Sequence, residues 1–146
     1  MTAIIAWCIF IVLTAIAAVH GAWGGGVCWP RKTEAELVTV VIGHRSDRMP
    51  SPNQCYLAAL AIFIPGAIAL MLAGLVQAPL PPWLVLLAGA GAALVFAGRG
   101  IAGYASAWRA RHPREPFATL DRRYYSPLCL LLAAGLVALL ANGMRN

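Results

Sequence analysis

The sequence predicts an all-α membrane protein: four transmembrane helices in an up-down bundle with two long cytoplasmic connections. Three observations predict this class. The chain is 61% hydrophobic and only 11% charged, whereas about a quarter of the residues of a soluble domain are charged. The apolar residues gather in separate segments, and the basic residues gather between them. The length of 146 residues suits a single transmembrane domain, residues 1–146.

Four apolar segments are expected to span the membrane: residues 3–22, 52–76, 83–103 and 127–141. Crossing hydrocarbon takes about 20 helical residues, so the first three are long enough. The fourth is short unless residues 122–126 add a turn or the bilayer thins locally. The first segment lacks the basic start and the cleavage pattern of a signal peptide, so we expect it to be retained.

The connections divide the chain into two helical hairpins, residues 1–76 and 83–142. "QAPLPPW" at 77–83 predicts a tight turn, because its prolines stop both helices. "EAELVTVVIG" at 34–43 predicts a short helix at the membrane interface, or else a loop segment packed under the bundle. Two helix starts look alike, since Ser51 precedes Pro52 and Ser126 precedes Pro127, which suits an N-cap followed by a first helical residue.

The basic residues predict the orientation. Of the 11 Lys and Arg residues, all except Arg145 lie in the two long connections or at the end of the third span. Cytoplasmic loops collect Lys and Arg, so both termini are expected outside and the long connections in the cytoplasm. This rule explains the net charge of +6 with the lipid bilayer as partner and without a nucleic acid.

Polar and aromatic side chains from separate segments fall at one depth, on the side of the long connections: His20, Trp23, Arg99, Asp121, Tyr125 and Ser126. Arg99 lies about 6 Å inside the end of its span, so it either snorkels to the interface or pairs with another side chain. If the side chains converge, Arg99 and Asp121 form a partly buried ion pair. Tyr125 and His20 would then supply hydrogen bonds and Trp23 an aromatic wall. The alternative is that these residues only decorate an interface rich in loops.

The sequence contains few motifs for metal binding, redox chemistry or hydrolysis. There is no C-x-x-C pair, no metal-ligand spacing, no serine-hydrolase motif and no carboxylate within a predicted span. We therefore predict no metal and no cofactor, and the sequence leaves open whether the protein is an enzyme. The small residues of the third span, among them Gly89, Ala93 and Ala97, are expected to serve close helix packing.

Four stretches carry a resemblance to a known family: "HGAWGGGVCWP", "MPSPNQCYLAALA", "RGIAGY" and "FATLDRRYYSPLCLLLA". They resemble a bacterial family of small four-span membrane proteins known only as a domain of unknown function. The residues that match its pattern are His20, Trp23, Arg99, Gly100, Gly103, Asp121, Tyr125, Ser126, Pro127, Leu128 and Cys129. The resemblance implies four spans, and it implies no activity.

Three functions fit these observations. The first is a membrane protein with a polar pocket near the cytoplasmic side, which binds or acts on a small amphipathic ligand such as a lipid, a quinone or an isoprenoid. The second is an accessory or scaffold subunit of a larger membrane complex. The third is a small transporter that would have to form a homo-oligomer to make a pore.

Overall fold

The computed structural model describes residues 1–43, 48–77 and 80–143, and every regular element among them is helical. Four helices are long and apolar enough to cross a membrane, which confirms the predicted all-α, four-span architecture. In chain order the elements are α1 (Thr2–Gly24), α2 (Glu34–Val41), α3 (Pro52–Leu72), α4 (Pro82–Ala102), α5 (Ser106–Arg111), α6 (Phe117–Leu120), the π-helical turn η1 (Asp121–Tyr125) and α7 (Ser126–Gly143).

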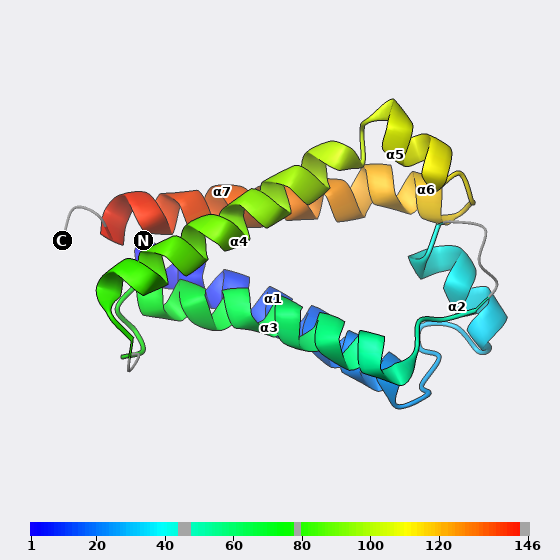
Figure 1. The fold of residues 1–146 in the computed structure, drawn as a ribbon, viewed down its shortest axis with the longest axis horizontal. Coiled ribbons are helices and arrows are strands. Elements are labelled where there is room, and N and C mark those ends of the chain that lie inside the picture. The colour runs from blue at the N-terminus through cyan, green and yellow to red at the C-terminus, as the bar shows by residue number, and fades with distance from the viewer. Residues whose placement is uncertain (44–47, 78–79, 144–146) are drawn as a thin grey trace.

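The long helices pair into two hairpins, α1 with α3 and α4 with α7. Both termini lie at the same end as the connection from α3 to α4 (Figure 1), and we call this the terminal end. The other end carries α2, α5 and α6, and we call it the loop end. The hairpins converge at the terminal end and diverge toward the loop end (Figure 1). At the loop end the hairpins meet again where α2 contacts α6.

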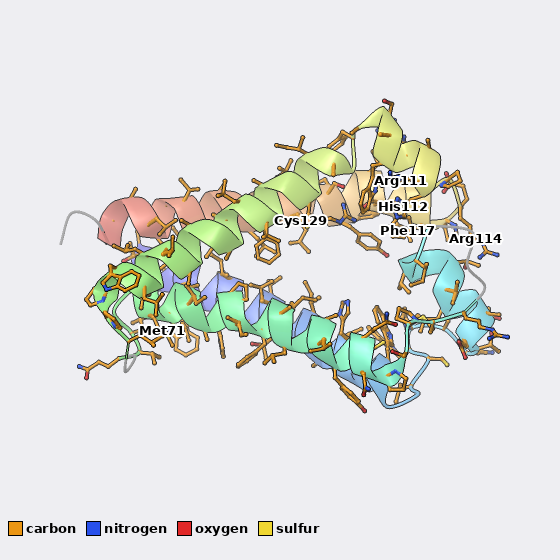
Figure 2. All side chains as sticks on the ribbon, in the orientation of Figure 1. Met71, Arg111, His112, Arg114, Phe117 and Cys129 are labelled. Carbon is orange, nitrogen blue, oxygen red and sulfur yellow. The ribbon has the colours of Figure 1, made fainter. Side chains whose placement is uncertain are left out.

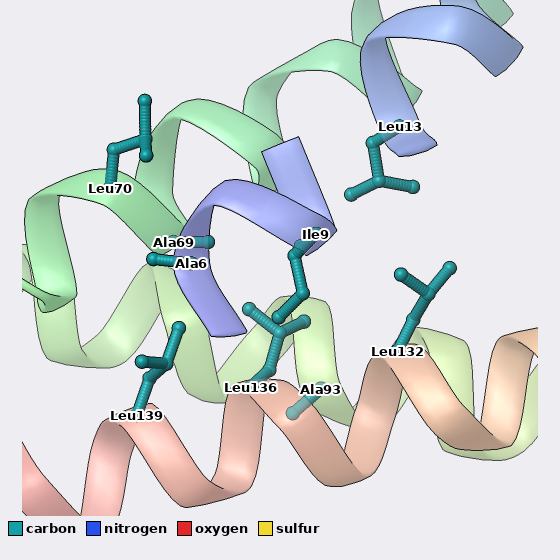
Figure 3. Packing of buried hydrophobic residues seen from close by; sticks show 9 residues of the cluster. All are labelled: Ala6, Ile9, Leu13, Ala69, Leu70, Ala93, Leu132, Leu136 and Leu139. Atoms are coloured by element: carbon teal, nitrogen blue, oxygen red, sulfur yellow. The ribbon is translucent and has the colours of Figure 1, made fainter. Parts of the chain in front are cut away.

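The contact between the hairpins is a cluster of buried apolar side chains (Figure 3). Leu136 of α7 is fully buried among residues of α1 and α4. The members are Ala6, Ile9, Leu13, Ala69, Leu70, Ala93, Leu132, Leu136 and Leu139. They come from the first half of α1, the last turn of α3, the middle of α4 and the middle and later turns of α7, so this core lies toward the terminal end. Close packing of this kind, rather than expulsion of water, holds helices together in lipid.

The helix bounds agree with the predicted spans at most ends. α3 stops at Leu72 instead of 76, because the chain turns at Gly74, which has φ of +69° and so takes a left-handed conformation that favours glycine. The predicted helix at 34–43 ends at Val41 for the same reason, since Gly43 has φ of +70°. The segment is a short helix, as the first alternative expects, and three of its apolar side chains are buried in the protein, as the second alternative expects of a packed segment: Leu37, Val38 and Val40.

The two Ser-Pro pairs differ, and this corrects one prediction. Ser51 is the N-cap of α3, in a capping box with Gln54, as predicted. Ser126 is not an N-cap, because the chain is already helical through α6 and η1, and the apolar helix extends over 27 residues, Phe117–Gly143. The fourth span is therefore long enough to cross a membrane, and the turn formed by residues 121–125 is what lengthens it.

The glycines of α4 divide into two faces. A Cβ at Gly89 would lie 2.8 Å from Leu72 of α3. A Cβ at Gly100 would lie 2.7 Å from Leu130 of α7, while one at Gly91 or Gly98 would meet nothing within 4 Å. The first two glycines therefore let neighbouring helices approach closely, as the predicted packing role requires.

Candidate functional site

Four side chains from four helical elements meet near the loop end, and we call them the loop-end cluster: Arg99, Trp108, Asp121 and Ser126. Arg99 comes from the last turn of α4, Trp108 from α5, Asp121 from η1 and Ser126 from the start of α7. The cluster therefore joins the two long helices of one hairpin to the connection between them.

Asp121 is the centre of the loop-end cluster. Its residue is only 2% exposed, and both carboxylate oxygens accept hydrogen bonds. Oδ1 lies 2.5 Å from Nη2 of Arg99 and accepts a second bond of 3.3 Å from the Ser126 hydroxyl. Oδ2 accepts a bond of 3.0 Å from Nε1 of Trp108. A buried carboxylate is tolerated only when it is paired and hydrogen-bonded in this way.

Arg99 is less enclosed than its partner. Besides the bond to Asp121, Nη1 lies 3.5 Å from the Ser126 hydroxyl, which is a weak contact. The guanidinium carbon lies 4.6 Å from the centre of the Trp108 ring, in cation–π range. A guanidinium has five N–H groups, and within the described residues only these two bonds are made. The side chain of Arg99 is 29% exposed, so three N–H groups remain for another partner.

The local sequence explains how Asp121 and Ser126 meet. The N–H of Ser126 bonds to the carbonyl of Asp121, five residues earlier, and this π-helical spacing places the two side chains together. Pro127 has no N–H to continue the α-helical pattern across this turn. Gly103 faces the same point, since a Cβ there would overlap the Ser126 hydroxyl oxygen. A glycine is therefore required for α4 to approach the cluster.

A row of rings extends from the cluster toward α2. The Trp108 and His112 rings stack with centroids 4.0 Å apart. His112 lies 5.9 Å from Phe117, and Phe117 lies 5.9 Å from Tyr125. The Tyr125 hydroxyl donates a bond of 3.4 Å to the carbonyl of Val40 in α2. Packing through this row therefore connects the loop-end cluster to the other hairpin.

The structure brings together three of the six predicted site residues. Arg99, Asp121 and Ser126 share the loop-end cluster, and the expected ion pair between the first two is present. Tyr125 lies at the far end of the row of rings and bonds to α2 instead of to Arg99.

His20 and Trp23 pair with each other, with ring centroids 4.7 Å apart. Nδ1 of His20 lies 2.8 Å from the carbonyl of Ile16 in its own helix, and Trp23 donates to the carbonyl of Trp29. The described contacts of both residues are therefore with their own helix and the loop that follows it, and neither is brought to Arg99.

Sequence reasoning missed Trp108. Its indole N–H donates a hydrogen bond to Oδ2 of Asp121, and its ring covers Arg99. The available signal is the single Trp between Arg99 and Asp121 in "YASAWRARHP", because a buried carboxylate needs several donors and an indole supplies one.

Two hollows in the described surface lie away from the loop-end cluster. One of about 380 Å³ is at the terminal end, where Met71 and Leu72 face Val85 and Leu86. The other, of about 420 Å³, is on the outer side of α3 beside Tyr56 and Leu57. Within residues 1–43, 48–77 and 80–143, no group of three His, Cys, Asp or Glu side chains is placed to hold a metal ion. The chemistry that the cluster offers is hydrogen-bond donation from a cation.

The comparisons with known proteins give one match. Residues 13–136 match the model of a family described as a protein of unknown function (DUF3995). No curated protein and no solved structure matches the chain.

Proposed function

The chain therefore belongs to the DUF3995 family, which carries no described activity, and we propose from its own contacts that it binds a small amphipathic molecule. The polar head of this molecule meets Arg99, and its apolar part lies between the two hairpins. The observation that carries the proposal is the guanidinium of Arg99, which is ion-paired but 29% exposed, with three N–H groups left without a bond within the described residues.

The position of Arg99 supports this proposal. Phe96, three residues earlier, packs against the core between the hairpins, and residues three apart lie on one face of a helix. Arg99 therefore belongs to the face of α4 that looks toward that core. The two hairpins diverge toward the loop end (Figure 1), and in the proposed complex the apolar chain follows this face of α4 from the guanidinium toward the core.

The charge of the loop-end cluster limits the head groups that a ligand can have. Arg99 and Asp121 together are neutral, so the site offers directed N–H donors without a net positive charge. A phosphate, a carboxylate or a carbonyl oxygen is the head group that such donors recognise. Lipids, quinones and isoprenoids all provide one of these groups next to an apolar chain.

The test removes the pair without leaving a buried charge behind. The double variant Arg99→Met with Asp121→Leu replaces both ions by apolar side chains of similar volume, a change that proteins often tolerate. Arg111→Met removes one exposed arginine of the same connection and serves as the matched control. Each protein is purified in mild detergent and offered phosphatidylglycerol, ubiquinone or undecaprenyl phosphate, and bound molecules are counted by native mass spectrometry.

We expect the native protein and the Arg111→Met control to retain one of the three molecules at near equal stoichiometry. The double variant should lose at least about tenfold in retention, because charge-assisted bonds contribute 1.5–3 kcal/mol. Equal retention by the double variant, or retention of none of the three by the native protein, overturns the proposal. Recovery of a second protein chain in fixed ratio would instead support the accessory subunit, and flux across liposomes the transporter.

We also infer the orientation from charge. Most arginines of the chain lie at or near the loop end, and cytoplasmic loops collect basic residues. We therefore propose that the loop end faces the cytoplasm and both termini face outside, with the chain in a bacterial inner membrane. Labelling of cysteines introduced at Ser106 and Thr2 by an impermeant reagent on intact cells distinguishes the two orientations, since only Thr2→Cys should react.

A further inference from the structure

Residues 34–43, which comprise α2 and the two residues after it, join one hairpin to the other at the loop end, and we call them the strap. Its start is fastened to the first hairpin, where the Glu34 carboxylate accepts a bond of 3.0 Å from the N–H of Met49, just before α3. Its end lies on the second hairpin, where the carbonyl of Gly43 accepts a bond of 3.1 Å from the N–H of Arg114.

The contact of the strap with the second hairpin is small and specific. Three apolar side chains of the strap are buried, as are Phe117 and Ala118 of α6. Gly43 lies against the Phe117 ring so closely that a Cβ would overlap it. The remaining link is the bond from Tyr125 to the carbonyl of Val40. Figure 2 shows Phe117 at the loop end, next to His112 and Arg114.

The length of the strap limits its stability. α2 has eight residues, and an isolated helix shorter than about 12 residues is marginal in water. Its helical form therefore depends on the docking against α6. Segments with few buried contacts open first when a protein fluctuates. The hairpins themselves are held by the core toward the terminal end, so the strap can leave α6 without separating them.

We propose that the strap is a lid, which is closed when Gly43 packs on the Phe117 ring of α6 and opens when Gly43 leaves that ring. Its function rests on the proposed binding of an amphipathic molecule, because the closed strap reaches Tyr125, the neighbour of Ser126 in the loop-end cluster, and opening uncovers this end of the site. In the closed position, the strap contacts Tyr125. One turn later on α7 lies Cys129, which is partly exposed and supplies a chemical probe of the lid.

The test variant is Gly43→Ala. Alanine disfavours φ of +70° and its methyl group would overlap Phe117, so the closed position is penalised twice. Gly26→Ala is the matched control, because Gly26 has φ of +85° but nothing within 4 Å of its Cβ position. It carries the same backbone strain without the overlap. Phe117→Ala removes the ring without any backbone strain and gives a second way to open the lid.

The measurement is the rate at which a water-soluble maleimide modifies Cys129, in a background where Cys8, Cys28 and Cys55 are alanine. We expect Gly43→Ala and Phe117→Ala to raise this rate at least about tenfold, because overpacking at a close contact shifts a closed equilibrium by this order. Gly26→Ala should leave it near the parent rate. If neither variant reacts faster than Gly26→Ala, the lid is overturned.

A second measurement separates the lid from the proposed function. Replacement of bound lipid by deuterated phosphatidylglycerol is followed by native mass spectrometry in the same variants. Faster replacement with Gly43→Ala supports a lid over an occupied site. Faster modification of Cys129 with no lipid bound to any variant supports the opening of the strap but overturns the proposed function. Bound lipid with unchanged rates of modification and replacement overturns the lid and leaves the binding site.

Discussion

The two hairpins contain similar helices but differ in what holds each one at the loop end. In the α1–α3 hairpin the contacts are apolar and close. At the loop end Gly24 packs against the Tyr56 ring, and nearer the terminal end Gly66 packs against the backbone of Phe10. In the α4–α7 hairpin, Gly100 and Gly103 provide the same close approach, but a buried carboxylate and a guanidinium lie between the helices as well.

This difference indicates what the ion pair is for. Within the described residues no ion pair joins α1 to α3, so the fold does not need a charged pair to join two helices of this length. Replacing a buried ion pair by apolar residues is often neutral or stabilising. Only the α4–α7 hairpin, among the described residues, buries a carboxylate such as Asp121. This favours a role for the ion pair in binding or in fixing the position of α5 over a role in stability.

The largest expected effect comes from breaking the ion pair on one side only. Asp121→Ala leaves the Arg99 guanidinium partly buried without its counter-ion, and removes the acceptor of Trp108. We expect a loss of about 3–5 kcal/mol in the free energy of unfolding, measured by chemical unfolding in detergent. Glu115→Ala is the control, because Glu115 is an exposed carboxylate of the same connection and should cost less than about 1 kcal/mol.

The double variant tests whether the ion pair itself stabilises the α4–α7 hairpin. Arg99→Met with Asp121→Leu should recover most of the loss expected for Asp121→Ala, because no unpaired charge remains. Only the cost of about 1–3 kcal/mol for the donors of Trp108 and Ser126 that lose Asp121 should persist. A double variant as unstable as Asp121→Ala would mean that the ion pair itself stabilises the hairpin. The contrast drawn between the two hairpins would then be wrong.

The second effect tests how firmly each hairpin is packed. Gly103→Ala places a methyl group on the Ser126 hydroxyl and within 3.1 Å of Asp121 Oδ2, and both of these side chains are buried. We expect a loss of about 1–3 kcal/mol by chemical unfolding in detergent. Gly24→Ala in the first hairpin meets the Tyr56 ring at 2.8 Å, but Tyr56 is half exposed and can move away, so its cost should be smaller.

The control for both glycine variants is Gly98→Ala, whose methyl group meets nothing within 4 Å. It should stabilise the helix by up to about 1 kcal/mol, because alanine has the higher helix propensity. If Gly24→Ala is as costly as Gly103→Ala, the first hairpin is as firmly packed as the second at its loop end.

Sequence patterns predicted the spans well because hydropathy and length decide them. The limits of α1 and α4 lie within about two residues of the predicted segments. The end of the helices at which a polar residue lies was also predicted from the sequence. His20, Arg99 and Asp121 all lie toward the loop end of the molecule. The ion pair between Arg99 and Asp121 followed from this depth and from the scarcity of other partners.

Depth does not predict which residues meet. His20 lies on one hairpin and Arg99 on the other, and the hairpins diverge at that level (Figure 1). Which way each helix faces depends on packing elsewhere, such as the contact of Leu136 with α1 and α4 (Figure 3). Trp108 was missed for a related reason, because a residue in a connection has no helical period that would place it beside Asp121.

The smallest expected effect distinguishes the two Ser-Pro pairs, one in each hairpin. Ser51 is an N-cap, where alanine costs about 1 kcal/mol and glycine only a few tenths. Ser126 lies inside a continuous helix, and its hydroxyl bridges Arg99 and Asp121. Alanine there should cost about 1 kcal/mol through the lost bonds, and glycine about 0.5–1 kcal/mol more through lost helix propensity. The order of the two substitutions is therefore opposite at the two serines, which chemical unfolding of the four single variants can measure. A contrary result would be a Ser126→Gly variant that is more stable than Ser126→Ala. Ser126 would then act as a helix cap, and the two hairpins would begin their second helices in the same way.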